Sequence, residues 1–285
     1  MKKNIFWLMG IVAMLAACES ESEPATAGQV KMTFSVQGDF DVPEFGGITR
    51  ALTADGKQMT DLWVLDYVDG TLVGQLHQTA EDEDFGTPTM TLDYGSHHVY
   101  FVASRGKTPT LSTVAHTITW ASTSDTFYKD YSVAVTSGTS ASHSVTMERV
   151  ATKLTVAILD EIPAGAATIE LTPATWYYGL DYVTGAATGA MNSEPRVINI
   201  PASYIGTAGD ITASIFGISG TTEWTTDVTI VARDGDDDIL GQATVEDAPF
   251  VANRSTKYSG NLFSSGGAFA LQLNGEWGDE LAGNW

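Results

Sequence analysis

Short runs in which apolar and polar residues alternate recur along most of this chain. The first, over residues 30–36, places an apolar residue at every second position. Because successive side chains of a strand point to opposite faces of a sheet, this period of two predicts a β-strand with one buried face. Two further apolar runs, 62–68 and 71–76, flank Asp69-Gly70. An Asp-Gly pair readily adopts the positive φ angles of a tight turn, so the pattern predicts a β-hairpin here.

Similar runs continue to the end of the chain, separated by Gly, Ser, Thr, Asp and Pro. We expect further strands over 89–92, 99–103, 117–120, 131–135, 144–147, 151–159, 167–171, 196–200, 211–217, 228–233, 239–245, 257–263 and 268–273. No window shows a sustained 3.6-residue period with helix caps. Many short strands at close spacing are typical of antiparallel sandwiches. We therefore predict an all-β protein with two tandem β-sandwich domains, residues 29–147 and 148–285.

The N-terminus has a different pattern. Lys2 and Lys3 precede an apolar run over residues 5–17, which is shorter than the about 20 residues of a membrane-spanning helix and is typical of a secretory signal. Small residues before Cys18 match the lipobox of bacterial lipoproteins. We therefore expect cleavage of a lipoprotein signal peptide, residues 1–17, and lipidation of Cys18. The alternative is an ordinary signal peptide that contains a cysteine, but Cys18 is the only cysteine in the chain and has no intramolecular disulfide partner.

Residues 18–28 are acidic and polar, and we interpret them as a tether. The acidic run 19–23 is similar to an export tag that sends some lipoproteins to the outer face of the outer membrane; the alternative is a solvated linker. The chain has 14 Lys and Arg against 35 Asp and Glu, a net charge of −21 that becomes −23 when Lys2 and Lys3 are removed. Such a charge repels nucleic acid and anionic lipid surfaces, which argues against both as partners.

Few patterns in the chain point to chemistry. The five histidines lack metal-binding spacing, and His97 and His98, neighbours on an expected strand, are interpreted as a surface pair. Residues 234–238 are the best calcium candidate because their carboxylates alternate, but Ile239 and Val245 occupy positions where an EF-hand needs Gly and Glu. A charged hairpin turn is therefore favoured. We predict no catalytic residue, no metal site, no cofactor and a non-enzymatic function.

Several segments resemble the fimbrillin superfamily, whose members include pilins, anchors and tip subunits of type V pili. They are Leu62–Tyr67 with Asp69-Gly70, Leu92–Gly95 with Val99–Ala103, Glu148–Leu154, and Asn253–Thr256 with Gly260–Phe263. Each motif alone is weak, but with the lipobox they cover most of the chain. The resemblance implies two transthyretin-like Greek-key sandwiches and is strongest for the anchor-type or a related fimbrial subunit.

The resemblance also implies how subunits would assemble. In family pilins a trypsin-like protease removes an N-terminal segment, which opens a groove for a neighbour's C-terminal strand. Here Arg50 and Ala51 lie in a Gly-rich stretch where such a cut could fall, although a solvated loop residue is the simpler interpretation of Arg50. An anchor would keep this segment and its lipid. Residues 279–285 could be a donor strand or a packed chain end. The implied partners are the outer membrane, other fimbrial subunits, and host or bacterial surface ligands.

A second function class remains open, a lipidated glycan-binding protein that works beside a nutrient-import complex. Its candidate sugar-stacking residues are Trp120, Trp176, Tyr177, Tyr178 and Trp224.

Overall fold

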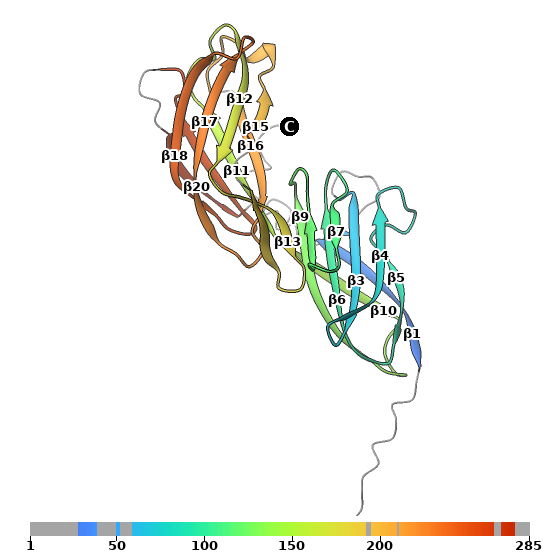
Figure 1. Ribbon diagram of the computed structural model, residues 1–285. Coiled ribbons are helices and arrows are strands. Elements are labelled where there is room, and N and C mark those ends of the chain that lie inside the picture. Colours follow the sequence, from blue (N-terminus) through green and yellow to red (C-terminus); the bar gives the residue numbers. More distant parts are fainter. Residues whose placement is uncertain are drawn as a thin grey trace, which may run out of the picture.

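The computed structural model describes residues 28–38, 50–51, 59–191, 195–209, 211–264 and 269–276. Within these ranges the chain forms strands gathered in two elongated lobes, one after the other (Figure 1). The strands of the first half are β1 (Gln29–Gly38), β2 (Arg50–Ala51), β3 (Asp61–Val68), β4 (Thr71–Thr79), β5 (Thr89–Asp93), β6 (Gly95–Ser104), β7 (Thr110–Ser112), β8 (Thr117–Thr119), β9 (Thr126–Val135) and β10 (Ser142–Arg149).

The strands of the second half are β11 (Ala151–Ile158), β12 (Ala166–Pro173), β13 (Trp176–Asp181), β14 (Ala186–Met191), β15 (Arg196–Asn199), β16 (Ile211–Ile218), β17 (Trp224–Asp234), β18 (Ile239–Phe250), β19 (Arg254–Gly260) and β20 (Phe269–Glu276). A 3-10 turn, η2 (Ala202–Tyr204), interrupts them. The predicted all-β sandwich class is confirmed.

The first lobe is a sheet that turns back on itself to make two layers. Its strand order is β2-β1-β10-β9-β6-β3-β4, with β5 paired to β1. Only two residue pairs, Glu148–Tyr128 and Arg149–Phe127, join β10 to β9, and the sheet folds over at this corner. Apolar side chains from β1, β5 and β10 meet those from β3, β6 and β9 in one buried core. Burial of this apolar surface is the main term that stabilises the lobe.

The second lobe packs one four-stranded sheet, β16-β11-β19-β20, against another, β15-β12-β17-β18. Its core takes alternate side chains from both sheets, as expected for an aligned sandwich. In each lobe one pairing is parallel, β1 with β10 and β11 with β19, which differs from the purely antiparallel arrangement that the sequence suggested. The repeated pairing gives the two halves of the chain a related topology.

A fourth sheet is shared between the two halves of the chain. The β7–β8 hairpin pairs through β8 with β13, giving the order β14-β13-β8-β7. This sheet lies against the outer face of β3 and β6, and a third core fills the space between them. That core contains Leu65, Tyr67, Tyr100, Val102, Ile118, Trp120, Val150, Leu180, Tyr182 and Ile218. The limits 29–147 and 148–285 remain predictions, but the hairpin β13–β14 lies against strands of the other half.

The shared sheet explains the almost continuous apolar sequence of β3. Leu62 and Val64 are in the first core, whereas Leu65 and Tyr67 are in the third core. A strand covered on both faces has no solvent-facing side, so strict alternation is lost. The hairpin from β3 to β4 is as predicted, with φ of 48° at Asp69 and 75° at Gly70.

Candidate functional site

Strand β1 lies between two other strands of the first lobe. It pairs with β5 over residues 29–33 and with β10 over residues 33–38, and so holds these two strands together (Figure 1). Three of its side chains, Met32, Phe34 and Val36, are completely buried in the first core. The Phe34 ring packs edge-on against Phe101, with ring centroids 5.2 Å apart. Fully burying one such side chain is worth about 1.5–3 kcal/mol, so β1 is a major part of this lobe.

The backbone of β1 is also bonded beyond its regular pairings. The amides of Phe34 and Val36 each donate over 2.9 Å, to the carbonyls of Pro88 and Gly86. Loss of β1 would leave these carbonyls and the edge of β10 without partners. Unpaired buried backbone groups are costly, so the vacated space would favour another extended strand.

Arg50 and Ala51, the predicted processing site, form the short strand β2. Their backbone pairs antiparallel with Gly38 and Gln37 at the end of β1. Their side chains and residues 39–49 and 52–58 lie outside the described structure. A cut between Arg50 and Ala51 would separate β1 from the remainder of the chain, because β3 and all later strands follow it.

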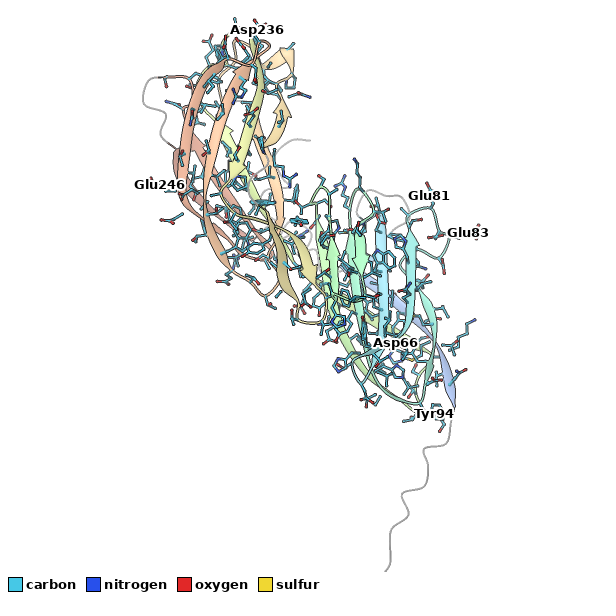
Figure 2. The ribbon with its side chains drawn as sticks, in the orientation of Figure 1. Asp66, Glu81, Glu83, Tyr94, Asp236 and Glu246 are labelled. Carbon is cyan, nitrogen blue, oxygen red and sulfur yellow. The ribbon has the colours of Figure 1, made fainter. Side chains whose placement is uncertain are left out.

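A buried pair fixes the other end of β1. His97 Nδ1 lies 2.7 Å from Asp66 Oδ1, and its Nε2 lies 2.8 Å from the carbonyl oxygen of Asp93. Gln29, the first residue of β1, donates to the Asp93 carboxylate over 2.8 Å. Figure 2 shows Asp66 close to this end of the lobe. Burial raises the pKa of the Asp66 carboxyl, and the hydrogen bond and charge of His97 oppose this shift.

The interpretation of His97 and His98 as a surface pair is wrong for His97. The two rings do point to opposite faces, but His97 is 2% exposed, whereas His98 is exposed and lies 3.2 Å from the Asp130 carboxylate. His97 was missed because its polar partner, Asp66, is 31 residues away in sequence. The apolar residues around Asp66 were the available signal that this carboxyl is buried.

The calcium candidate at 234–238 is a hairpin turn between β17 and β18. Asp234 Oδ1 accepts hydrogen bonds from the amides of Asp236 and Asp238, each 2.9 Å long. One carboxylate is therefore occupied by the turn itself, and Figure 2 shows Asp236 at the tip of the second lobe. Within the described ranges, no three His, Cys, Asp or Glu side chains are grouped so that they could hold a metal ion.

Two of the five aromatic residues considered for sugar stacking are buried. Trp120 and Trp176 are each 2% exposed. Trp224 stacks on Phe250, with ring centroids 4.2 Å apart, so this face of its indole is covered. Tyr177 and Tyr178, on β13, and Trp224 are each half-exposed. The five residues therefore do not form an exposed platform.

Cys18, the tether and residues 279–285 lie outside the described residues. In the described portion, no helix has the length and apolar character needed to cross a bilayer.

Comparisons with known proteins identify the fold. No protein-family model and no curated protein matches the chain. Among solved structures, a candidate adhesin from Bacteroides ovatus aligns with a TM-score of 0.53 and 11% identity, covering 86% of this chain and 93% of that one. A candidate polysaccharide-binding protein from Bacteroides thetaiotaomicron aligns with a TM-score of 0.50 and 9% identity, over 85% and 96% of the two chains. A fimbrial assembly protein from Parabacteroides distasonis aligns with a TM-score of 0.48 and 11% identity, over 87% and 96%.

The chain thus shares the all-β fold of proteins described as adhesins. Neither the candidate adhesin nor the candidate polysaccharide-binding protein is described as an enzyme.

Proposed function

We propose that this protein is a surface-exposed outer-membrane lipoprotein that acts as a subunit or anchor of a type V fimbrium. In this proposal Cys18 carries the lipid, and other fimbrial subunits join by β-strand addition. The shared fold with a candidate adhesin and the fimbrillin-like segments of the sequence support it.

The main support for the proposal is the position of β1 in the first lobe. This strand is paired on both sides and supplies three completely buried side chains, yet it is followed by a segment that contains Arg50 and Ala51. Cleavage there would allow β1 to leave and a strand from another subunit to enter. The incoming strand would restore both the backbone hydrogen bonds and the apolar core. An anchor would retain β1 and the lipid, and would accept no strand at this place.

The strand-addition proposal is tested with purified protein that starts at Gly28. Trypsin at a limiting dose should cut after Arg50 and produce ladders of oligomers that resist mild denaturation. Arg50→Gln should abolish both the cut and the ladder. Arg105→Gln, which changes an exposed arginine elsewhere, is the matched control and should behave as wild type. A cut after Arg50 that yields only stable monomers would refute strand addition in this form, and resistance at Arg50 would favour an anchor.

The lipid anchor is tested separately. Cys18→Ser should release the protein from the cell envelope and abolish labelling by a palmitate analogue. Retention of the unlabelled variant in the envelope would refute the anchor. Sequencing the mature N-terminus distinguishes a blocked Cys18 from a free Ala51.

The second function, glycan binding, has support from the candidate polysaccharide-binding protein of the same fold. Its sites would have to exclude the buried Trp120 and Trp176. A glycan array probed with residues 28–285 tests it, and Tyr178→Ala should weaken binding if the half-exposed tyrosines contribute.

A further inference from the structure

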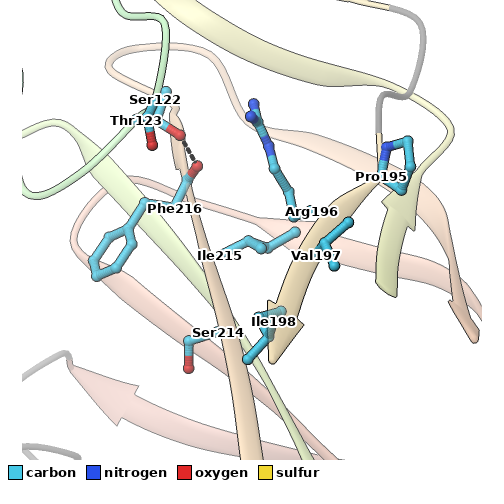
Figure 3. Close-up of a pocket in the computed structure, with 9 residues that line it drawn as sticks. All are labelled: Ser122, Thr123, Pro195, Arg196, Val197, Ile198, Ser214, Ile215 and Phe216. Carbon is cyan, nitrogen blue, oxygen red and sulfur yellow. Dashed lines mark hydrogen bonds between the residues drawn. The ribbon is translucent and has the colours of Figure 1, made fainter. Parts of the chain in front are cut away.

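The second lobe has an open groove on one side. It lies between β15 and β16, the terminal strands of the two sheets that form the sandwich, and has a volume of about 510 Å³ (Figure 3). A loop from the first half of the chain, Ser122 and Thr123, lies at one end. The remaining lining is supplied by residues 195–198 and 214–216. The groove is therefore flanked by two strand edges, and neither β15 nor β16 pairs with a second strand in the described part of the chain.

The edge of β16 that faces this groove pairs with no other strand in the described part of the chain. The Phe216 carbonyl accepts hydrogen bonds from the Thr123 hydroxyl and, over 3.0 Å, from the Trp176 indole. Neither donor belongs to β11, so this carbonyl points away from the paired side of β16. Backbone groups that face the same side recur at every second residue, which places those of Ser214 and Thr212 on the open edge. Thr123 and Trp176 thus close one end of the edge and leave the remainder available.

Apolar side chains line the groove beside this edge. Ile215 belongs to the buried core, and Ile198 packs against that core while remaining half-buried. Val197, on the opposite strand, is 55% exposed. An extended chain laid along β16 would cover the exposed part of Ile198 beside Ile215. Alternate side chains of such a chain would point toward the apolar surface.

Arg196 gives the groove a positive charge. Its side chain extends from the start of β15 toward the loop that carries Ser122 (Figure 3). Among the described residues it forms no ion pair, although the protein has 35 acidic side chains. By contrast, Arg233 and Arg149 are each paired with carboxylates. An unpaired guanidinium above an open strand edge favours a carboxylate ligand, which it can bind through two parallel hydrogen bonds.

The other side of the same sandwich is protected against added strands. There β18 carries Glu246 and Asp247 on its exposed edge, with Pro249 two residues further and an irregular register beside them. Charges, proline and bulges are the usual means of blocking an edge. Strand β16 has none of these features, since its residues Ile211–Ile218 include no charge and no proline and its register with β11 is regular; Pro195 and the charged Arg196 lie on the β15 side of the groove.

We propose that the groove between β15 and β16 binds an extended acidic peptide segment of a partner protein. The peptide backbone pairs with Ser214 and Thr212, one apolar side chain covers Ile198 and Ile215, and a Glu or Asp carboxylate pairs with Arg196. This groove is distinct from the place that β1 occupies in the first lobe, and the proposal does not depend on the function proposed above.

The probe for this proposal is the capped, fluorescently labelled heptapeptide Thr-Ser-Val-Glu-Val-Ser-Thr, titrated with residues 28–285. A matched probe replaces its Glu by Gln. We expect saturable binding of the Glu probe and about five- to tenfold weaker binding of the Gln probe. Arg196→Gln should weaken the Glu probe by the same factor and leave the Gln probe unchanged, because the carboxylate and the guanidinium act as a pair. Arg105→Gln should bind as wild type.

The backbone contact is tested at Ser214. Ser214→Pro removes the edge amide, which strand edges tolerate, and should abolish binding of both probes. Both substitutions remove the Ser214 hydroxyl, which lies 2.9 Å from the Thr155 hydroxyl. Ser214→Ala keeps the backbone amide, so this variant should bind both probes as the wild type does. Melting temperatures verify that both variants are folded.

Three results would overturn the proposal. They are no saturable binding of the Glu probe at 1 mM, equal binding of both probes to wild type, and unchanged binding to a folded Ser214→Pro variant. Glucuronic acid is titrated in parallel. Binding of this sugar with the same dependence on Arg196, but of neither peptide, would assign an acidic glycan to the groove instead.

Discussion

The phenolic oxygens of Tyr67 and Tyr182 lie 2.8 Å apart, and this hydrogen bond joins residues 115 positions apart in the sequence. Tyr67 is on β3 of the first lobe, and Tyr182 follows β13 of the shared sheet. Tyr128 donates a further hydrogen bond to the Tyr182 carbonyl over 2.9 Å. The two halves of the chain are therefore joined by specific polar contacts within an apolar core, and the relative position of the lobes is fixed by more than the connection at Val150.

Tyr67→Phe and Tyr182→Phe test this contact. Each variant should lose about 1 kcal/mol of unfolding free energy, the typical contribution of one buried hydrogen bond. The double variant should lose less than the sum of the two, because both substitutions remove the same bond. Urea unfolding followed by tryptophan fluorescence measures the cycle. Tyr177→Phe, at a half-exposed site, is the control, and strict additivity would show that the bond contributes nothing.

His97→Ala should destabilise the first lobe by about 3–5 kcal/mol, because it leaves the Asp66 carboxylate buried without its partner. His98→Ala, one residue away but exposed, should change stability by less than about 0.5 kcal/mol. Thermal unfolding at pH 7 compares the two. Similar effects of both substitutions would contradict the buried pair.

Asp160 organises the loop after β19. Its carboxylate accepts the amides of Leu262, Phe263 and Ser264 at 2.8–3.0 Å. Partial burial raises the pKa of Asp160, but these backbone hydrogen bonds outweigh burial and hold the pKa below its ordinary value of 3.8. Because the folded-state pKa is the lower one, the stability that this group contributes is present above pH 3.8 and is lost as the pH falls through the folded-state pKa.

Asp160→Ala should therefore cost about 2 kcal/mol at pH 7, the scale of hydrogen bonds to a charged group, and much less at pH 2. Urea midpoints at the two pH values give the comparison. Glu161→Gln, at the neighbouring exposed site, should show no such difference. An equal loss for Asp160→Ala at both pH values would contradict an ionised acceptor.

Gly220→Ala should be among the most destabilising single-methyl additions. Gly220 has a φ of 56°, and a Cβ placed there would overlap the carbonyl oxygen of Gly185. The backbone strain and the overlap together predict a loss of about 2–5 kcal/mol. Gly235→Ala is the control, because a Cβ there meets nothing within 4 Å. If the melting temperatures of the two variants differed by less than about 2 °C, the predicted overlap at Gly220 would be contradicted.

The sequence predicted most strands because their alternation reports a single buried face. It failed for the hairpin β13–β14, whose residues Trp176, Tyr177 and Tyr178 were considered as a sugar platform. The buried face of this hairpin is set by contacts with β3 and β6, more than 70 residues earlier, and no local pattern shows them. The three-residue strand β7 was too short to show any period.

The candidate sites were predictable to different degrees. Arg50 and Ala51 were identified from the sequence, but the double-sided pairing of β1 became visible only in the fold. Arg196 was predicted only as the start of a strand. Its role as an unpaired cation above a groove depends on β15 and β16 lying at the same side of the lobe, which arises from the topology of two separate sheets.

The shared sheet limits how genes for such chains could recombine. A crossover at residue 148 would separate Leu65, Tyr100 and Val102 of the first half from Leu180 and Tyr182 of the second half, so each group would lose apolar side chains that cover it in the third core. If one half were fused to an unrelated domain, it would fold stably only when that domain covered the same apolar side chains. The two halves are therefore expected to evolve together.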